Sequence, residues 1–162
     1  MRPRAVLFIY GEGGHRAQMK RLYARLAPRM EEKGLVAVGI CENGDELDGF
    51  VNYSQRGMRD KHSHLKSYIL LPVRLIHSFL ILVQLVVSYR IEGVISTGPG
   101  IAIVPSIALK LLGARIVFIE SWSRFETTSM TGRVMYRVAD RFYIQNRSLQ
   151  SHYPDAIYGG LL

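Results

Sequence analysis

The chain has 162 residues, of which 48% are apolar and 21% charged. This composition excludes a disordered chain and provides enough apolar material for one domain with its own core. The single cysteine, Cys41, excludes a disulfide framework, and no Cys/His set has zinc spacing, so a reducing cytosolic compartment is favoured. The formal charge of +8 predicts an anionic partner: nucleic acid, a phosphorylated substrate or an acidic membrane surface.

Strands and helices alternate along the chain. Short runs of branched and aromatic residues predict strands buried on both faces, and apolar residues at spacings of three and four predict helices. In chain order we expect a strand at 5–10, a helix at 15–32, strands at 35–40 and 50–53, a helix at about 70–89, a strand at 93–96, a helix at 101–112, a strand at 115–119, a helix at 131–138 and a strand at 141–144. This order predicts an α/β fold with a single Rossmann-like, doubly wound parallel sheet over residues 1–162.

The predicted helix at about 70–89 is apolar nearly all round. Pro72 fits its first turn, and its few polar residues share one narrow stripe. One face of a small sheet does not cover such a helix, so we expect partial insertion into one membrane leaflet, with the basic segment 56–66 on anionic headgroups. Burial against a partner protein and an ordinary core position are the alternatives. The membrane-associating residues are expected to be Arg74, Leu80, Leu82 and Val86.

Ligands of doubly wound sheets bind beyond the carboxyl ends of the strands, so the loops there hold the candidate site. The glycine loop at 11–15 lets a ligand approach the backbone and attracts anions to a helix start, although a plain tight turn is the alternative. It is not a dinucleotide fingerprint, because Arg16 stands where the third glycine belongs, and it is not a P-loop. His15 is either a general base or a helix-start residue bonded to backbone.

Two further loops carry candidate ligand groups. A second glycine loop follows the strand at 93–96, and Glu120 precedes a loop of hydroxyl side chains with one arginine, which suits hydroxylated or phosphorylated ligands. Helix capping by Ser129 or Thr131 is a compatible alternative. The substrate-binding candidates are Gly11, Gly13, Gly14, Thr97, Gly98, Gly100, Ser121, Arg124 and Ser129.

Five motifs together resemble one family over nearly the whole chain. They are Gly11-x-Gly-Gly-His15, Ser96-Thr-Gly-Pro-Gly100, Ile119-Glu-Ser-Trp-Ser-Arg124, Ser129-Met-Thr-Gly132 and Ala139-Asp-Arg-Phe-Tyr-Ile-Gln145. The chain resembles the membrane-associated, acceptor-binding subunit of two-component GT-B glycosyltransferases, the Alg14-like and PssD-type family. It is more distantly similar to the N-terminal half of the lipid-II-forming MurG transferase.

The resemblance implies the acceptor-side half of a GT-B enzyme. That half would anchor to the membrane an inverting, UDP-sugar-dependent N-acetylglucosaminyltransferase that acts on a polyprenyl-diphosphate-linked saccharide. A separate donor-binding subunit would hold the UDP-sugar, and no cofactor or metal is expected. His15 is the expected base and Glu120 the second choice. The glycine loops would donate backbone N–H groups to the carrier diphosphate or to the donor's phosphates, and Arg124 would add charge. Glu12 departs from the small or hydroxyl residue expected in this loop.

The chain begins directly at its first strand, whereas eukaryotic members are expected to begin with a membrane helix. We therefore expect a bacterial-type member on the cytoplasmic face of the inner membrane rather than the endoplasmic reticulum, bound peripherally or as a monotopic protein. A basic nucleic-acid-binding module is the first alternative, although the basic residues are expected to be scattered over helix faces and no nucleic-acid partner is expected. A nucleotide-dependent oxidoreductase is the second, although its fingerprint fails at Arg16.

Overall fold

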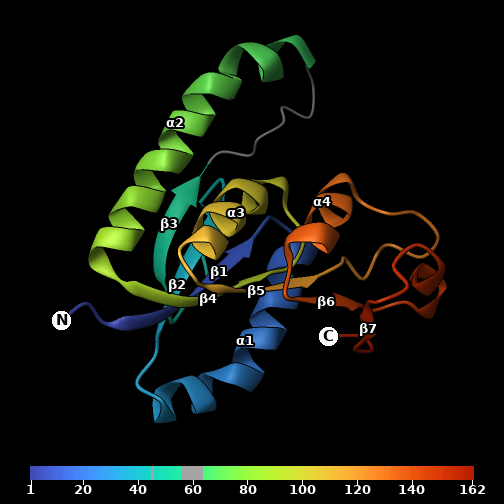
Figure 1. Ribbon diagram of the computed structural model, residues 1–162, viewed down its shortest axis with the longest axis horizontal. Coiled ribbons are helices and arrows are strands. Elements are labelled where there is room, and N and C mark those ends of the chain that lie inside the picture. The colour runs from blue at the N-terminus through green and yellow to red at the C-terminus, as the bar shows by residue number, and fades with distance from the viewer. Residues whose placement is uncertain (45, 56–63) are drawn as a thin grey trace.

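The computed structural model contains one parallel sheet of seven strands (Figure 1). It describes residues 1–44, 46–55 and 64–162, and for residues 64–71 it describes the backbone only. The strands are β1 (Arg4–Tyr10), β2 (Val36–Glu42), β3 (Val51–Gln55), β4 (Arg90–Ser96), β5 (Arg115–Ile119), β6 (Arg141–Ile144) and β7 (Ile157–Tyr158). The helices are α1 (Gly14–Glu32), α2 (His64–Ser88), α3 (Ile103–Leu111) and α4 (Met130–Val138), with short 3-10 helices η1 (Gly100–Ala102) and η2 (Arg147–Ser151). The predicted single parallel sheet is confirmed.

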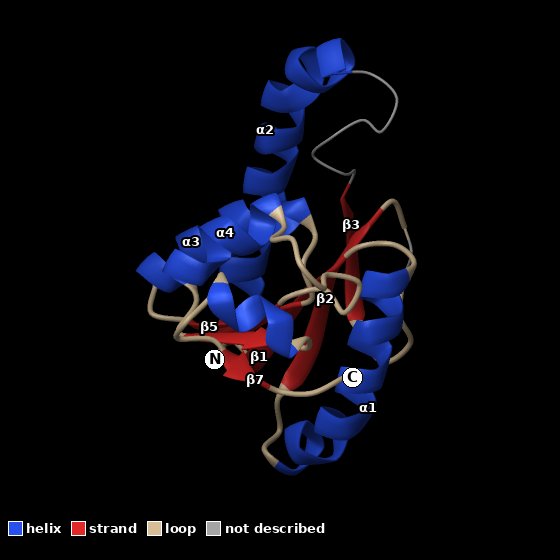
Figure 2. Ribbon diagram, turned by 90° about the vertical axis from the view of Figure 1, so that its right-hand side faces the viewer, coloured by secondary structure: helices blue, strands red, loops and turns tan. Residues whose placement is uncertain are grey.

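The strand order is β3-β2-β1-β4-β5-β6-β7, so the chain changes direction across the sheet between β1 and β4. Helix α1 covers one face, and α2, α3 and α4 cover the other (Figure 2). Along β1, Leu7 and Ile9 belong to the core on the side of the three helices, whereas Phe8 and Tyr10 belong to the core beside α1. Burial on both faces explains why this strand is continuously apolar.

The strands expected at 35–40 and 50–53 are present as β2 and β3, and among the described residues no helix lies between them. One detail of the predicted order is wrong. Helix α2 begins at His64, earlier than expected, so Pro72 lies inside the helix and not in its first turn. Proline lacks an N–H group, and the helix therefore forgoes one backbone hydrogen bond at this position.

The two long sides of α2 are both apolar, but only one of them is buried. Ile81, Leu82 and Leu85 pack into the core, where Leu82 is 8% exposed. The opposite side, which we call the outer apolar face, is formed by Val73, Ile76, Phe79, Leu80, Val83 and Val87. Among the helices in the described part of the chain, none combines the length and apolar character needed to cross a membrane.

The expected membrane residues of α2 therefore divide between its two sides. Leu80 lies on the outer apolar face, where a membrane contact is possible. Leu82 does not, because it packs against the sheet, and Val86 is partly buried beside the same core. Arg74 is also half-buried. The expected basic segment at 56–66 falls mostly outside the described residues.

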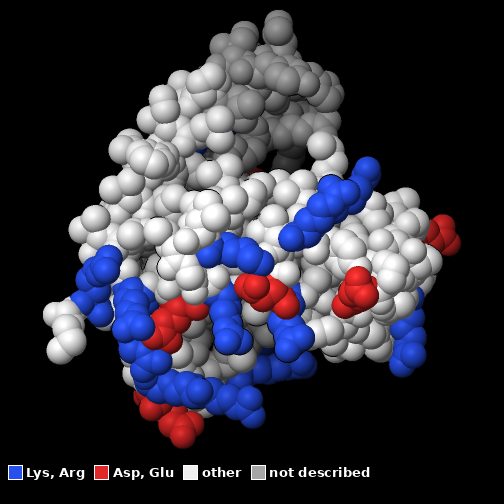
Figure 3. Space-filling view, in the orientation of Figure 1, with Lys and Arg blue, Asp and Glu red and all other residues white. Residues whose placement is uncertain are grey.

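The basic residues were expected to be scattered over helix faces. In the described part of the chain, some of them also gather at the starts of strands. Four neighbouring strands each begin with an arginine, which places Arg4, Arg90, Arg115 and Arg141 in a row at the amino-terminal edge of the sheet. Glu92 pairs with Arg4 in this row at 2.6 Å. Figure 3 shows Lys and Arg gathered along the lower side of the molecule and nearly absent over the described part of α2.

The packing of α2 predicts how its substitutions affect stability. Leu85→Ala should lower the free energy of unfolding by about 2–5 kcal/mol, because the side chain is fully buried and leaves a cavity. Val87→Ala on the outer apolar face should change it by about 0.5 kcal/mol or less. Urea denaturation measures both values. An equal loss in the two variants would contradict the assigned orientation of the helix.

Candidate functional site

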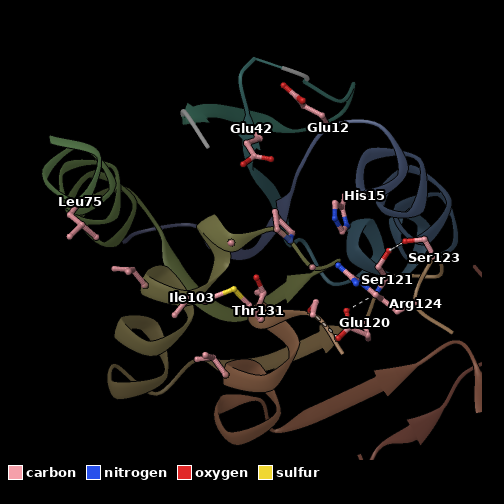
Figure 4. A pocket seen from close by; sticks show the side chains of 17 residues that line it. Glu12, His15, Glu42, Leu75, Ile103, Glu120, Ser121, Ser123, Arg124 and Thr131 are labelled. Atoms are coloured by element: carbon pink, nitrogen blue, oxygen red, sulfur yellow. Dashed lines mark hydrogen bonds between the residues drawn. The ribbon is translucent and has the colours of Figure 1, made fainter. Parts of the chain in front are cut away.

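A cavity of about 710 Å³ opens at the carboxyl-terminal edge of the sheet, beside the point where the strand order reverses. This is the usual ligand position in such sheets. Its walls come from the loops after β1, β2, β4 and β5 and from α2, α3 and α4 (Figure 4). The lining residues are Glu12, His15, Glu42, Leu75, Gly98, Pro99, Gly100, Ile103, Val104, Glu120, Ser121, Ser123, Arg124, Ser129, Met130, Thr131 and Val134.

His15, in the first turn of α1, is held by the loop that follows β4. Its Nδ1 lies 2.5 Å from the carbonyl oxygen of Thr97, and the Thr97 hydroxyl donates to the carbonyl oxygen of His15 at 3.0 Å. A carbonyl only accepts, so Nδ1 carries the proton and Nε2 keeps its lone pair. Burial lowers the pKa of His15 below its ordinary value, although the Thr97 bond and the charge of Glu120 partly offset this. The imidazole is therefore neutral at pH 7 and able to accept a proton at Nε2.

The imidazole fits where it does because two of its neighbours are glycines. A Cβ atom on Gly98 would lie 2.9 Å from His15 Cε1, and one on Gly11 would lie 3.4 Å from Cδ2. Gly98 also has a φ of +114°, which side-chain-bearing residues rarely adopt. The glycines at 11 and 98 thus make room for the ring, and only Gly98 lines the cavity.

Glu120 follows β5 and is fully buried beneath the cavity. Three donors surround its carboxylate: the Ser121 N–H at 3.0 Å, the Ser129 hydroxyl at 3.0 Å and the Tyr153 hydroxyl at 3.2 Å. Ser129 is also the N-cap of α4, because its Oγ accepts the Gly132 N–H at 2.7 Å. The capping role expected for Ser129 and its contact with the cavity are both present.

Arg124 lies in the loop after Glu120 and lines the cavity. Asn146 holds this loop by donating to the carbonyl oxygens of Trp122 at 2.9 Å and Arg124 at 2.5 Å. The N-termini of η1 and α4, at Gly100 and Met130, also meet the cavity. Backbone N–H groups at helix starts and a guanidinium make this wall suitable for an anion.

The far end of the cavity is apolar and was not predicted from the sequence. Its side chains are Leu75, Ile103, Val104, Met130 and Val134. The spacing of Met130 and Val134 puts them on one side of a helix, which is a local signal. Nothing local indicates Leu75, because its place in the cavity depends on how α2 packs on the sheet and on α3. In Figure 4, Leu75 and His15 lie at opposite ends of the site.

The structure brings most of the predicted substrate-binding residues into this one cavity. They are Gly98, Gly100, Ser121, Arg124 and Ser129, together with the predicted catalytic residues His15 and Glu120. Thr97 is buried and acts through its bonds to His15. Gly13 and Gly14 do not line the cavity; both are exposed, and Gly14 lies against Trp122.

The contact between Gly98 and His15 predicts the behaviour of a double variant. Gly98→Ala should destabilise the protein by about 1–3 kcal/mol, through an unfavourable φ and displacement of the imidazole. Gly113→Ala is the matched control, because Gly113 also has positive φ but no described neighbour within 4 Å of an added Cβ. In a His15→Ala background the cost of Gly98→Ala should fall to that of Gly113→Ala, as measured by thermal or urea unfolding. An unchanged cost in that background would rule out the proposed clash.

Solved structures with this fold include A. baumannii MurG, with a TM-score of 0.60, 15% identity and coverage of 88% of this chain and 41% of that chain. Another is the S. aureus MnaA–UDP co-structure, with a TM-score of 0.61, 15% identity and coverage of 93% and 40%. The chain therefore spans about two fifths of each of these proteins. These likenesses define the class: a Rossmann-like α/β fold of the kind found in GT-B glycosyltransferases.

The sequence comparison then gives the family. Residues 6–162 match the model of the family described as "Oligosaccharide biosynthesis protein Alg14 like", and the chain belongs to that family. A curated relative is the human UDP-N-acetylglucosamine transferase subunit ALG14, which is 26% identical over 96% of this chain and 82% of its own length. The family membership expected from the motifs is confirmed.

Proposed function

We propose that the chain is the acceptor-binding, membrane-attached subunit of an inverting glycosyltransferase that transfers a sugar, such as N-acetylglucosamine, from a UDP-sugar to a polyprenyl-diphosphate-linked saccharide. The name of the human relative supports a UDP-sugar reaction. A separate subunit would supply the donor site, facing the cavity from the carboxyl-terminal edge of the sheet. Activity would therefore require both chains.

The observation that carries the proposal is the contact between His15 Nδ1 and the carbonyl oxygen of Thr97 in the wall of the cavity. The His15 Nδ1–H is committed to the Thr97 carbonyl, so Nε2 is the proton acceptor at the polar end of the cavity. In the proposed reaction Nε2 takes the proton of the acceptor hydroxyl while the hydroxyl oxygen bonds to the anomeric carbon. The bond from that carbon to UDP breaks on the opposite side, which inverts the configuration, and UDP leaves as an anion.

The two ends of the cavity suit the two ends of a lipid-linked acceptor. The saccharide would lie near His15, and the first part of the lipid would lie against the apolar end lined by Leu75, Ile103 and Met130. The diphosphate between them would meet the helix starts at Gly100 and Met130 and the guanidinium of Arg124. Gly13 and Gly14 do not line the cavity, so the proposed arrangement does not include them.

The outer apolar face of α2 is the proposed membrane contact. Phe79 and Leu80 are 60% and 58% exposed, and Val87 is 67% exposed. An apolar face of this kind suits a helix that enters one leaflet at the interface. Because Leu75 of the same helix lines the cavity, such a contact would place the apolar end of the cavity beside the lipid. We propose the cytoplasmic face of a bacterial inner membrane, rather than the endoplasmic reticulum, and peripheral or monotopic attachment.

The catalytic proposal is tested with the reconstituted pair of subunits. His15→Ala should lower the turnover number roughly 100-fold or more, because the acceptor hydroxyl loses its base. The activity of the unsubstituted pair should fall at acidic pH only below about 6.5, the ordinary pKa of histidine, because burial keeps His15 neutral to lower pH. Near-normal turnover by His15→Ala would refute the base, and turnover by this chain alone would refute the need for a partner.

The membrane proposal is tested by liposome flotation with vesicles that contain anionic lipid. Substitution of Phe79, Leu80 and Val83 by Asp should reduce the floated fraction strongly, because each charge would enter an apolar layer. The matched control replaces Phe125, Ile157 and Leu161 by Asp, since these exposed apolar residues lie outside α2. Circular dichroism checks that both proteins are folded. Equal flotation of the two triple variants would contradict the assigned face.

A further inference from the structure

We propose that Glu120 is a positioning residue rather than a proton acceptor, and that its caged carboxylate supports His15 electrostatically while Tyr153, which lies outside the cavity, holds that carboxylate in place. The inference deepens the proposed function, because it assigns separate roles to two residues of the same site. It also brings in a tyrosine that no sequence motif indicated.

The cage around Glu120 argues against a direct role in proton transfer from substrate. Both carboxylate oxygens accept hydrogen bonds, Oε1 from the Ser121 N–H and Oε2 from the hydroxyls of Ser129 and Tyr153. The Gln145 side chain also donates to the Glu120 carbonyl oxygen at 2.9 Å. A carboxylate whose two oxygens both accept hydrogen bonds from the protein is held in one orientation, and these oxygens are already engaged by the protein's own donors.

The cage also links three parts of the chain that form the site. Ser121 begins the loop that carries Arg124, Ser129 caps α4 at the cavity wall, and Tyr153 follows η2. Space around the carboxylate is tight: a Cβ on Gly132 would lie 1.9 Å from Glu120 Oε2 and 2.7 Å from the Tyr153 hydroxyl oxygen. The carboxylate therefore fixes where the loop and α4 stand relative to β5.

Tyr153 is suited to be a permanent donor to this carboxylate. The side chain is 2% exposed, and its ring packs against Phe142 and Tyr136 with centroid distances of 4.7 Å and 4.9 Å. Burial, and then the charge of Glu120, raise the pKa of Tyr153 far above its ordinary value. The phenol consequently keeps its proton throughout the working pH range and donates it to Glu120.

Glu120 and His15 line the same cavity, so the negative charge of the carboxylate favours the protonated form of the imidazole. Burial and the Arg124 guanidinium lower the pKa of His15, whereas the Thr97 bond and Glu120 raise it. Glu12 and Glu42 are the other acidic residues that line the same cavity. A protonated His15 forms as the acceptor hydroxyl reacts, and the buried negative charge of Glu120 would stabilise it.

An NMR titration of the isolated chain tests the effect of Glu120 on His15 without any substrate. The His15 Cε1–H signal, assigned by its absence in His15→Ala, gives the pH midpoint of the imidazole. Glu120→Gln should lower this midpoint by about 0.5 unit or more, because it removes a negative charge that favours the imidazolium. Glu42→Gln is the matched control and should shift it less. An unchanged midpoint in Glu120→Gln, or an equal shift in Glu42→Gln, would overturn the role of Glu120.

Tyr153→Phe removes one donor to the Glu120 carboxylate and leaves its charge unchanged. This variant therefore tests the cage even if Glu120→Gln does not fold. Trp122 is the sole tryptophan and lies in the loop after Glu120, so its fluorescence reports the position of that loop. Tyr153→Phe should shift its emission, whereas Tyr136→Phe, which removes a hydroxyl bonded to Asp155 in the same aromatic cluster, should not. Wild-type emission in Tyr153→Phe, or an equal shift in Tyr136→Phe, would overturn the role of Tyr153.

Turnover of the reconstituted pair separates this inference from the proposed function. If Glu120 acts through His15, then Glu120→Gln retains measurable turnover, and the acid limb of its pH profile moves to lower pH together with the NMR midpoint. Loss of turnover as complete as in His15→Ala, with no shift in the midpoint, would make Glu120 the base. A shifted midpoint in a pair that shows no glycosyltransfer at all would support the inference and refute the proposed function.

Discussion

Two hydrogen bonds between His15 and Thr97 join the start of α1, which follows β1, to the loop that follows β4. The strand order reverses between these two strands. One of these bonds uses the ring nitrogen Nδ1 and the other uses the backbone of His15. The ring is thereby fixed in orientation and in tautomer at the same time. The two interpretations that the sequence left open for His15, a backbone-bonded helix start and a base, are compatible, because the bond at Nδ1 leaves Nε2 able to accept a proton.

Helix α2 has two apolar sides, of which one is buried in the core and the other is exposed. The inner side completes the core against the sheet, and Leu75 extends from the same helix to the cavity. The outer apolar face has no cover among the described residues. One helix therefore connects the surface proposed to meet lipid with the end of the cavity proposed to receive a lipid-linked acceptor. In the proposed arrangement, the packing of α2 on the sheet would set the distance between the membrane and the cavity.

Much of the site could be predicted from the order of strands and helices, because the loops after parallel strands meet at one edge of the sheet. Once the strands were placed, His15, Gly98, Glu120 and Arg124 followed as neighbours at one edge of the sheet. The apolar end of the cavity did not follow, since it depends on how α2, α3 and α4 pack. Tyr153 was also out of reach, because 33 residues separate it from the carboxylate it contacts and no motif connects them.

The sequence by itself determined the parallel α/β sheet, the family and the loops that carry the polar groups of the site, because strand and helix patterns and the motifs are written in local residue order. Only the tertiary structure decided which side of α2 is buried, which moved Leu82 to the core and left Leu80 outside. It also decided that Gly13 and Gly14 stand apart from the cavity and that Glu120 is enclosed by donors. These features depend on contacts between distant segments, which the periodicity of a helix that is apolar on both sides does not specify.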